Sequence, residues 1–236
     1  MTEVSQRRSV FRLSPDRRIA DIVAAARAEI ADKGYEATSM LAIAARAGVV
    51  EGTLYRFFKT KQELMLSVAE QWLEEILAED SGLPRIRGTW NQLRHLIWRT
   101  LHLLHSQPAV SRFVLIDMRP TAGYRTTRLF KLNRRFTGEV RKVCESAIQA
   151  GEFRRDVSAA LLRDMIFGCI EHHTWAFLRG EADFVVDEVA DSIANVIFRG
   201  MAVAPPAQDR VQEDRMEQAV ARLEAAAERI ERSRGG

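Results

Sequence analysis

The stretch that decides the fold is Thr38–Leu64, which reads TSMLAIAARAGVVEGTLYRFFKTKQEL. Ser39 is a favourable N-cap, because its hydroxyl can accept a hydrogen bond from a free backbone N–H at a helix start. Apolar residues then recur at helical spacing up to Gly48, which suits the left-handed residue that ends many helices. After a short turn, Glu51–Phe57 begins a second helix. Two short helices joined by a Gly-bearing turn predict a helix-turn-helix, whose second helix enters the major groove of DNA.

The same stretch closely resembles the N-terminal domain of the tetracycline-repressor (TetR/AcrR) family of bacterial transcription regulators. The matching residues are Ile19-Ala20, Gly34-Tyr35, Thr38-Ser39, Ile43-Ala44, Ala47-Gly48-Val49, Gly52-Thr53-Leu54-Tyr55, Phe58, Lys59, Lys61 and Glu63-Leu64. The resemblance covers roughly the first quarter of the chain in detail, and the rest matches in length and helical character. It implies a ligand-responsive regulator, most often a repressor, that binds a palindromic operator as a dimer.

The resemblance also implies which side chains contact DNA. Ser39 is expected near a phosphate, and Thr38 either joins it there or belongs to the core. Tyr55 is expected to donate its hydroxyl to a phosphate, and Lys61 lies at a helix start that favours the same partner. The full predicted set is Thr38, Ser39, Arg46, Glu51, Gly52, Thr53, Tyr55, Arg56, Lys59 and Lys61.

Four residues depart from the family's common pattern. Leu41 and Ala42 replace charged or polar residues, and Val50 replaces a Ser that commonly caps the recognition helix. Glu51 places an acid at the groove-facing start of that helix, where it can accept from cytosine N4 but otherwise repels phosphate. These changes leave the usual contact set and the operator sequence open.

Composition indicates a globular protein in a reducing compartment. The 236 residues carry a formal charge of +3, with 47% hydrophobic residues. Cys144 and Cys169 are too few for a disulfide framework, so we expect two buried free thiols. The start of the chain has no apolar signal-peptide segment, and no run is long enough to cross a bilayer, so we expect a cytoplasmic protein.

Helical periodicity organises the chain into an all-α protein. A basic arm is predicted over 1–14, a helix-turn-helix domain with a connecting helix over 15–80, and a helical ligand-binding and dimerisation bundle over 89–203. The arm either lies along DNA phosphates or the minor groove, or is a solvated tail. Residues 207–236 predict an additional amphipathic helix. This helix either pairs with the same helix of a second subunit, folds back on the bundle, or is a charged helix of marginal stability.

The helices at about 159–201 are apolar over a wide face, more than one monomer's core requires. The resemblance implies that such a helix pair forms a four-helix interface between two subunits. A two-fold dimer would also space two recognition helices about one DNA turn apart. The apolar residues are Leu161, Met165, Ile166, Cys169, Ile170, Trp175, Phe177, Leu178, Phe184, Val185, Val189, Ile193, Val196, Ile197 and Phe198.

The resemblance implies a small-molecule pocket in the bundle, and apolar or aromatic side chains are candidates for its lining. We predict as ligand contacts Trp90, Ile97, Trp98, Leu101, Phe113, Met118, Phe130, Cys169, His173 and Trp175, with Leu93, Leu115, Phe167 and Ile170 as further candidates. For each of them the alternative is a plain core role. The run from Arg119 to Lys142 has eight Lys or Arg against Glu139 alone. It either receives an anionic head group, such as that of an acyl-CoA, or is a solvated helix face.

No enzymatic motif is recognisable. His102 and His105 share a helix face, but no acid or Cys completes a metal site. We therefore expect no catalytic residue, no metal and no cofactor. Two alternatives to a transcription regulator stay open. One is a helical adaptor with weakened DNA binding, and the other is an enzyme fused to a DNA-binding domain.

Overall fold

The structure, a computed structural model, describes residues 14–203. The N-terminal arm before Ser14 and the helix predicted over 207–236 lie outside the described residues. Within 14–203 no strand forms, and one isolated bridge joins Phe153 to Ala202. The helices are α1 (Pro15–Ala37), α2 (Met40–Arg46), α3 (Glu51–Phe57), α4 (Lys61–Ala78), α5 (Thr89–Ser106), α6 (Pro108–Arg112), α7 (Arg128–Gln149), α8 (Ala159–Leu178) and α9 (Val186–Met201). The all-α prediction is confirmed.

Side-chain caps begin α1, α2 and α4, and the sequence predicts the cap at Ser39. Ser14 Oγ accepts from the N–H of Arg17 at 3.2 Å, Ser39 Oγ from Ala42 at 3.1 Å, and Thr60 Oγ1 from Glu63 at 3.0 Å. Such caps satisfy backbone donors that a helix leaves free at its start. Val50 begins α3 without a side-chain cap, which confirms the departure noted in the sequence.

Two helical segments depart from regular α-helical geometry. Gly34 adopts φ 77° inside α1 and kinks it, and a further turn continues to Ala37. The short α6 is followed directly by a π-helical segment, Phe113–Met118, here called η2. The wider π turn is closed by the N–H of Arg119, which donates to the carbonyl of Val114 at 3.0 Å. Such segments are rare and often occur at functional sites.

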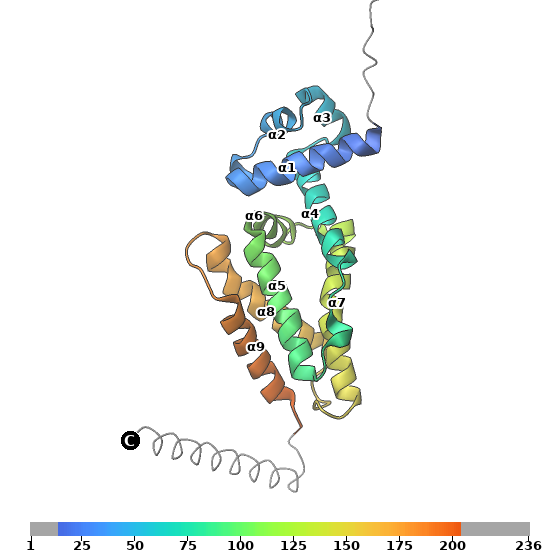
Figure 1. Ribbon diagram of the computed structural model, residues 1–236, viewed down its shortest axis with the longest axis vertical. Helices are drawn as coiled ribbons and strands as arrows, with labels where there is room; N and C mark the ends of the chain where they lie inside the picture. The colour runs from blue at the N-terminus through green and yellow to red at the C-terminus, as the bar shows by residue number, and fades with distance from the viewer. Residues whose placement is uncertain (1–13, 204–236) are drawn as a thin grey trace, which may run out of the picture.

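The helices are arranged as a small unit at one end of a longer bundle (Figure 1). Helices α1, α2 and α3 form the small unit, and α4 leads from it into the body. Helices α5, α7, α8 and α9 run along the long axis, and α6 lies across their end, next to α1.

Two hydrophobic cores correspond to this arrangement. The first combines α1–α4 with α6, η2 and the start of α7. The second joins α5, α7, α8 and α9. Because the first core includes residues on both sides of 80–88, the small unit is packed directly on the body.

The two cysteines lie in different environments. Cys144 is buried, and burial raises the pKa of its thiol to about 11, so it stays protonated. Cys169 is exposed on the outer face of α8, so the prediction of two buried thiols is wrong for this residue. It lies among other exposed apolar side chains of α8, such as Met165, so an apolar helix face does not by itself bury a thiol.

None of the helices in the described part of the chain is long and apolar enough to span a lipid bilayer.

Candidate nucleic-acid interface and ligand cavity

Helix α3 presents an exposed face because one side chain anchors its other side. Leu54 is fully buried, while Gly52, Tyr55 and Arg56 are exposed. Tyr55 is 43% exposed. Lys59 follows α3 and is also exposed. These side chains form a polar, basic surface at the end of the molecule.

Two exposed apolar residues flank that surface. Leu41 is 63% exposed at the start of α2, and Val50 is 73% exposed at the N-cap of α3. Ser39 lies beside Leu41, exposed, with its hydroxyl occupied as the cap of α2. Glu51 and Thr53 are half-buried. The face that α2 and α3 share therefore mixes hydrogen-bonding and apolar groups.

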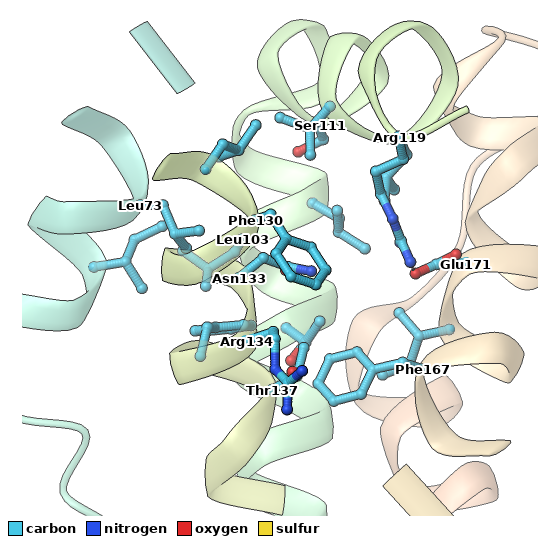
Figure 2. Close-up of a pocket in the computed structure, with 18 of the residues that line it drawn as sticks. Leu73, Leu103, Ser111, Arg119, Phe130, Asn133, Arg134, Thr137, Phe167 and Glu171 are labelled. Carbon is cyan, nitrogen blue, oxygen red and sulfur yellow. The ribbon is translucent and has the colours of Figure 1, made fainter. Parts of the chain in front are cut away.

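A cavity of about 350 Å³ lies in the body, between α4, α5, α7 and α8 (Figure 2). This volume is at the low end of the roughly 300–1,000 Å³ of small-molecule sites. The apolar lining residues are Trp72, Leu73, Ile76, Leu103, Leu104, Val114, Leu115, Leu129, Phe130, Phe136, Phe167 and Ile170. The polar ones are Thr100, Ser111, Arg119, Arg125, Asn133, Arg134, Thr137, Arg163, Asp164 and Glu171.

The arginines of the lining fall into two groups. Arg119 is paired with Glu171 across the cavity wall, and Arg163 is paired with Asp164 at 2.5 Å. Arg125 and Arg134 are exposed and have no acidic partner among residues 14–203. The guanidinium of Arg134 lies 5.9 Å from the centre of the Phe130 ring. Arg134 therefore offers a free positive charge where the cavity reaches solvent.

Comparison with known families assigns most of this chain. The model described as "Bacterial regulatory proteins, tetR family" matches residues 22–68, and "Tetracyclin repressor-like, C-terminal domain" matches residues 87–201. The chain belongs to the TetR family of transcription regulators. The first match spans the helix-turn-helix, so this TetR-family protein is a DNA-binding regulator, and the second spans α5–α9.

Relatives and solved structures agree with that assignment. The chain is 26% identical to the HTH-type transcriptional repressor KstR2 of Rhodococcus jostii, over 73% of this chain and 85% of the relative. It is similar to the crystal structure of FadR from Bacillus subtilis in complex with stearoyl-CoA, with a TM-score of 0.66, 21% identity and coverage of 77% and 98%. It is also similar to the crystal structure of AibR in complex with isovaleryl coenzyme A and operator DNA, with a TM-score of 0.60 and 18% identity. That match covers 77% of this chain and 98% of the AibR chain. The two structures show the same fold.

In this TetR-family protein, three of the predicted DNA contacts, Thr38, Lys61 and Arg46, are engaged within the fold. Thr38 is buried, and its hydroxyl donates to the carbonyl of Gly34 at 2.8 Å, so the core alternative is correct for it. Lys61 Nζ donates to the carbonyls of Tyr35 at 2.9 Å and Thr38 at 3.0 Å and lies over the Tyr35 ring. Its ammonium thus binds carbonyls at the end of α1, where a cation is favoured, instead of projecting from the surface.

Arg46 is likewise held by the fold. Its guanidinium forms an ion pair with Glu29 Oε2 at 2.8 Å and a second with Asp32, both on α1. The Glu29 side chain is only 4% exposed and is also paired with Lys33. Hydrogen bonding to Lys33 lowers the pKa of Glu29, which keeps it ionised beside Arg46. Arg46 therefore fixes α2 against α1, and the resemblance could not reveal that from sequence alone.

The cavity includes few of the predicted ligand contacts. Phe130 is the one of the ten predicted ligand contacts that lines the cavity. Three of the four further candidates, Leu115, Phe167 and Ile170, also line it. The nine others lie elsewhere, in the cores (Ile97, Leu101, Phe113, Met118), half-buried on α5 (Trp90, Trp98) or on the exposed face of α8 (Cys169, His173, Trp175). Trp90 Nε1 donates to Asn195 at 3.0 Å, which ties α5 to α9. Helical spacing identified apolar faces but not which neighbour each face meets.

Sequence reasoning missed the contribution of α4 and most of the polar lining. Trp72, Leu73 and Ile76 of α4 form one wall of the cavity. The basic run from Arg119 to Lys142 was the available signal for the arginines, and Arg119, Arg125 and Arg134 come from it. Among residues 14–203 no three His, Cys, Asp or Glu side chains are placed to share a metal ion.

The outer face of α8 and α9 is apolar and open. Leu161 is 52% exposed, Met165 47%, Trp175 45% and Val196 73%. A second, shallower hollow lies between the two helices, lined by Met165, Gly168, Cys169, His172, His173, Glu188, Val189, Ser192 and Ile193. Contiguous exposed apolar surface of this kind marks an interaction site.

Proposed function

We propose that this protein is a cytoplasmic repressor that binds a palindromic operator as a homodimer and is released from it by an acyl-CoA. The acyl group occupies the cavity of the body, and the anionic CoA portion lies against the arginines at its exposed end. The proposal assigns no catalytic role to the chain.

The observation that carries the proposal is the composition of the cavity. Its walls are mostly apolar, while Arg134 and Arg125 are exposed beside it without acidic partners in the described chain. An apolar chain ending in phosphates matches this arrangement, because burial favours the chain and arginine binds phosphate in a bidentate manner. The acyl-CoA complexes of FadR and AibR, which share the fold, support the same ligand class.

Helix α4 physically connects the cavity to the helix-turn-helix domain. Trp72, Leu73 and Ile76 line the cavity, and Lys61 at the other end of the same helix holds the carbonyl end of α1. A ligand that binds one position of α4 more tightly than another shifts the population toward that position. The orientation of the helix-turn-helix domain shifts with it. Such a shift changes the spacing of two recognition helices in a dimer.

Dimerisation is proposed through α8 and α9. Their outer face exposes Met165, Trp175 and Val196 beside the shallow hollow, and a second copy would bury this apolar area. A two-fold axis makes the interface self-complementary and places one recognition helix at each half-site of the operator.

The first experiment measures binding to the DNA upstream of the protein's own gene by fluorescence anisotropy at 50 and 200 mM salt. Tight binding that weakens steeply with salt is expected, because phosphate contacts release counterions. A Tyr55→Phe, Arg56→Ala double variant should bind at least about tenfold more weakly, since it removes two exposed polar groups of α3. Lys142→Ala, which removes an exposed charge from α7, is the matched control and should bind normally.

Octanoyl-CoA is then added to the complex. Release of DNA from the parent protein supports an acyl-CoA effector, and reduced sensitivity of an Arg134→Gln variant supports the proposed head-group contact. Specific DNA binding that no acyl-CoA alters would exclude the effector while retaining the regulator. Failure to bind any specific DNA would favour the adaptor alternative that Leu41 and Val50 suggested.

A further inference from the structure

Ser111 is the unusual polar group of the cavity. It lies in α6, its side chain is 1% exposed, and its hydroxyl has no hydrogen-bond partner among residues 14–203. A serine hydroxyl can donate one hydrogen bond and accept two, and a buried hydroxyl without a partner is destabilising. Ser111 also belongs to the cavity lining. The hydroxyl is therefore available to whatever molecule enters.

One other polar side chain of the lining, that of Thr100, is buried, and it is already engaged. Thr100 is 7% exposed, and its hydroxyl donates to the carbonyl of Leu96 at 2.8 Å. Arg119 and Glu171 satisfy each other across the wall. Because these partners are internal, Ser111 is the buried side chain of the lining that a ligand can newly satisfy.

The position of Ser111 determines which part of a ligand it meets. Figure 2 shows Ser111 and Arg134 at opposite ends of the cavity, with the ring of Phe130 between them. The proposed function places the charged CoA portion at the exposed Arg134, near solvent, because burying its phosphates without partners would be costly. Ser111 then faces the part of the acyl group that is remote from the thioester.

We propose that the effector's acyl group carries an oxygen, as a keto or hydroxyl group remote from the thioester, and that Ser111 hydrogen-bonds to it. This inference rests on the proposed acyl-CoA effector and specifies its substrate class. The volume of about 350 Å³ equals that of about a dozen waters, which suits a compact acyl group of similar heavy-atom number. An unsubstituted chain would leave the Ser111 hydroxyl unpaired in the complex.

The test compares octanoyl-CoA with 7-oxooctanoyl-CoA by isothermal titration calorimetry on the full chain. The parent protein should bind the oxo compound about tenfold more tightly, because a site built to hydrogen-bond an oxygen discriminates against the analogue that lacks it. Ser111→Ala should abolish this preference by weakening the oxo compound alone. Thr100→Val is the matched control, since the Thr100 hydroxyl is bonded internally, and should keep the preference.

The outcomes separate this inference from the proposed function. Equal binding of both compounds to the parent protein, or a preference that persists in Ser111→Ala, overturns the role of Ser111 and leaves an acyl-CoA effector intact. Binding of neither compound overturns the effector proposal and this inference with it. The comparison of ligands on the parent protein does not depend on how any variant folds.

Discussion

At the scale of single residues, Lys61 illustrates how a side chain that seems free in the sequence is engaged in the fold. The sequence placed it at a helix start facing phosphate, whereas its ammonium binds the carbonyls of Tyr35 and Thr38. The backbone carbonyls at the end of α1 carry no sequence signal, so this competition could not be predicted. Tyr55, by contrast, is exposed as expected because Leu54 fixes the orientation of α3.

Lys61→Ala should therefore affect stability as well as DNA binding. The variant loses two charge-assisted hydrogen bonds to carbonyls, and each bond to a charged group contributes a net stabilisation of about 1.5–3 kcal/mol when buried and less at the half-buried Lys61. We expect a lower midpoint of thermal unfolding, measured by circular dichroism. Lys59→Ala is the control, since Lys59 is exposed and should weaken DNA binding with an unchanged midpoint. Equal midpoints for both variants would contradict the structural role of Lys61.

Asp117 gives a pH-dependent prediction. Its Oδ2 is buried without a partner in the described chain, and burial raises the pKa of its carboxyl above the ordinary 3.8. A carboxyl with a raised folded-state pKa contributes stability that is fully present below its unfolded pKa and is lost as pH rises through the folded one. Asp117→Asn should therefore unfold at a higher temperature than the parent at pH 7, by about 3 °C. The difference should shrink toward pH 4, and a variant that melts lower at pH 7 would refute the assignment.

At the scale of helices, α4 and α7 are in direct contact beside the cavity, and we expect this contact to transmit ligand binding to the helix-turn-helix domain. Glu70 of α4 accepts a hydrogen bond at 3.0 Å from the N–H of Leu129, in the first turn of α7, and Glu74 is paired with Arg128. A carboxylate at a helix start is favoured by the free N–H groups and the helix dipole. Helix α7 in turn carries Phe130 and Arg134 of the lining.

We expect Glu70→Ala to weaken the coupling more than the binding of either partner. Octanoyl-CoA and operator should each still bind, but octanoyl-CoA should release less DNA than it does from the parent protein. Glu70→Gln keeps an oxygen that can accept from Leu129 and should retain most of the response. Anisotropy titrations with and without octanoyl-CoA measure this. A full response in Glu70→Ala would exclude the contact from the transmission.

Helix positions and their caps could largely be predicted, while the π-helical turn could not. Ser14, Ser39 and Thr60 begin helices because their hydroxyls accept local N–H groups, and such interactions are local in sequence. The π turn at η2 includes Phe113, whose ring packs on that of Tyr35 in α1, and sequence periodicity does not report such tertiary contacts. The composition of the cavity was missed for the same reason, since Leu73 and Phe130 meet only through the tertiary fold.

At the scale of the whole molecule, the outer face of α8 and α9 should hold two subunits together. Trp175→Arg places a charge on this apolar face, so we expect a monomer by light scattering coupled to size-exclusion chromatography. Operator affinity should fall at least about a hundredfold, because a monomer contacts one half-site. Gln149→Arg, a charge added at the exposed end of α7, is the control and should stay dimeric. A Trp175→Arg protein of unchanged mass would place the interface elsewhere.

The most direct test of the account measures the affinity of octanoyl-CoA in the absence and in the presence of saturating operator DNA. Coupling between two binding sites is reciprocal, so each ligand must weaken the other by the same factor, typically about 5–150-fold. The account predicts that octanoyl-CoA binds the DNA complex more weakly than it binds the free protein. The factor should equal the one by which octanoyl-CoA weakens the affinity of the protein for DNA. Equal affinity for the free and the DNA-bound protein would contradict an effector that acts through the cavity.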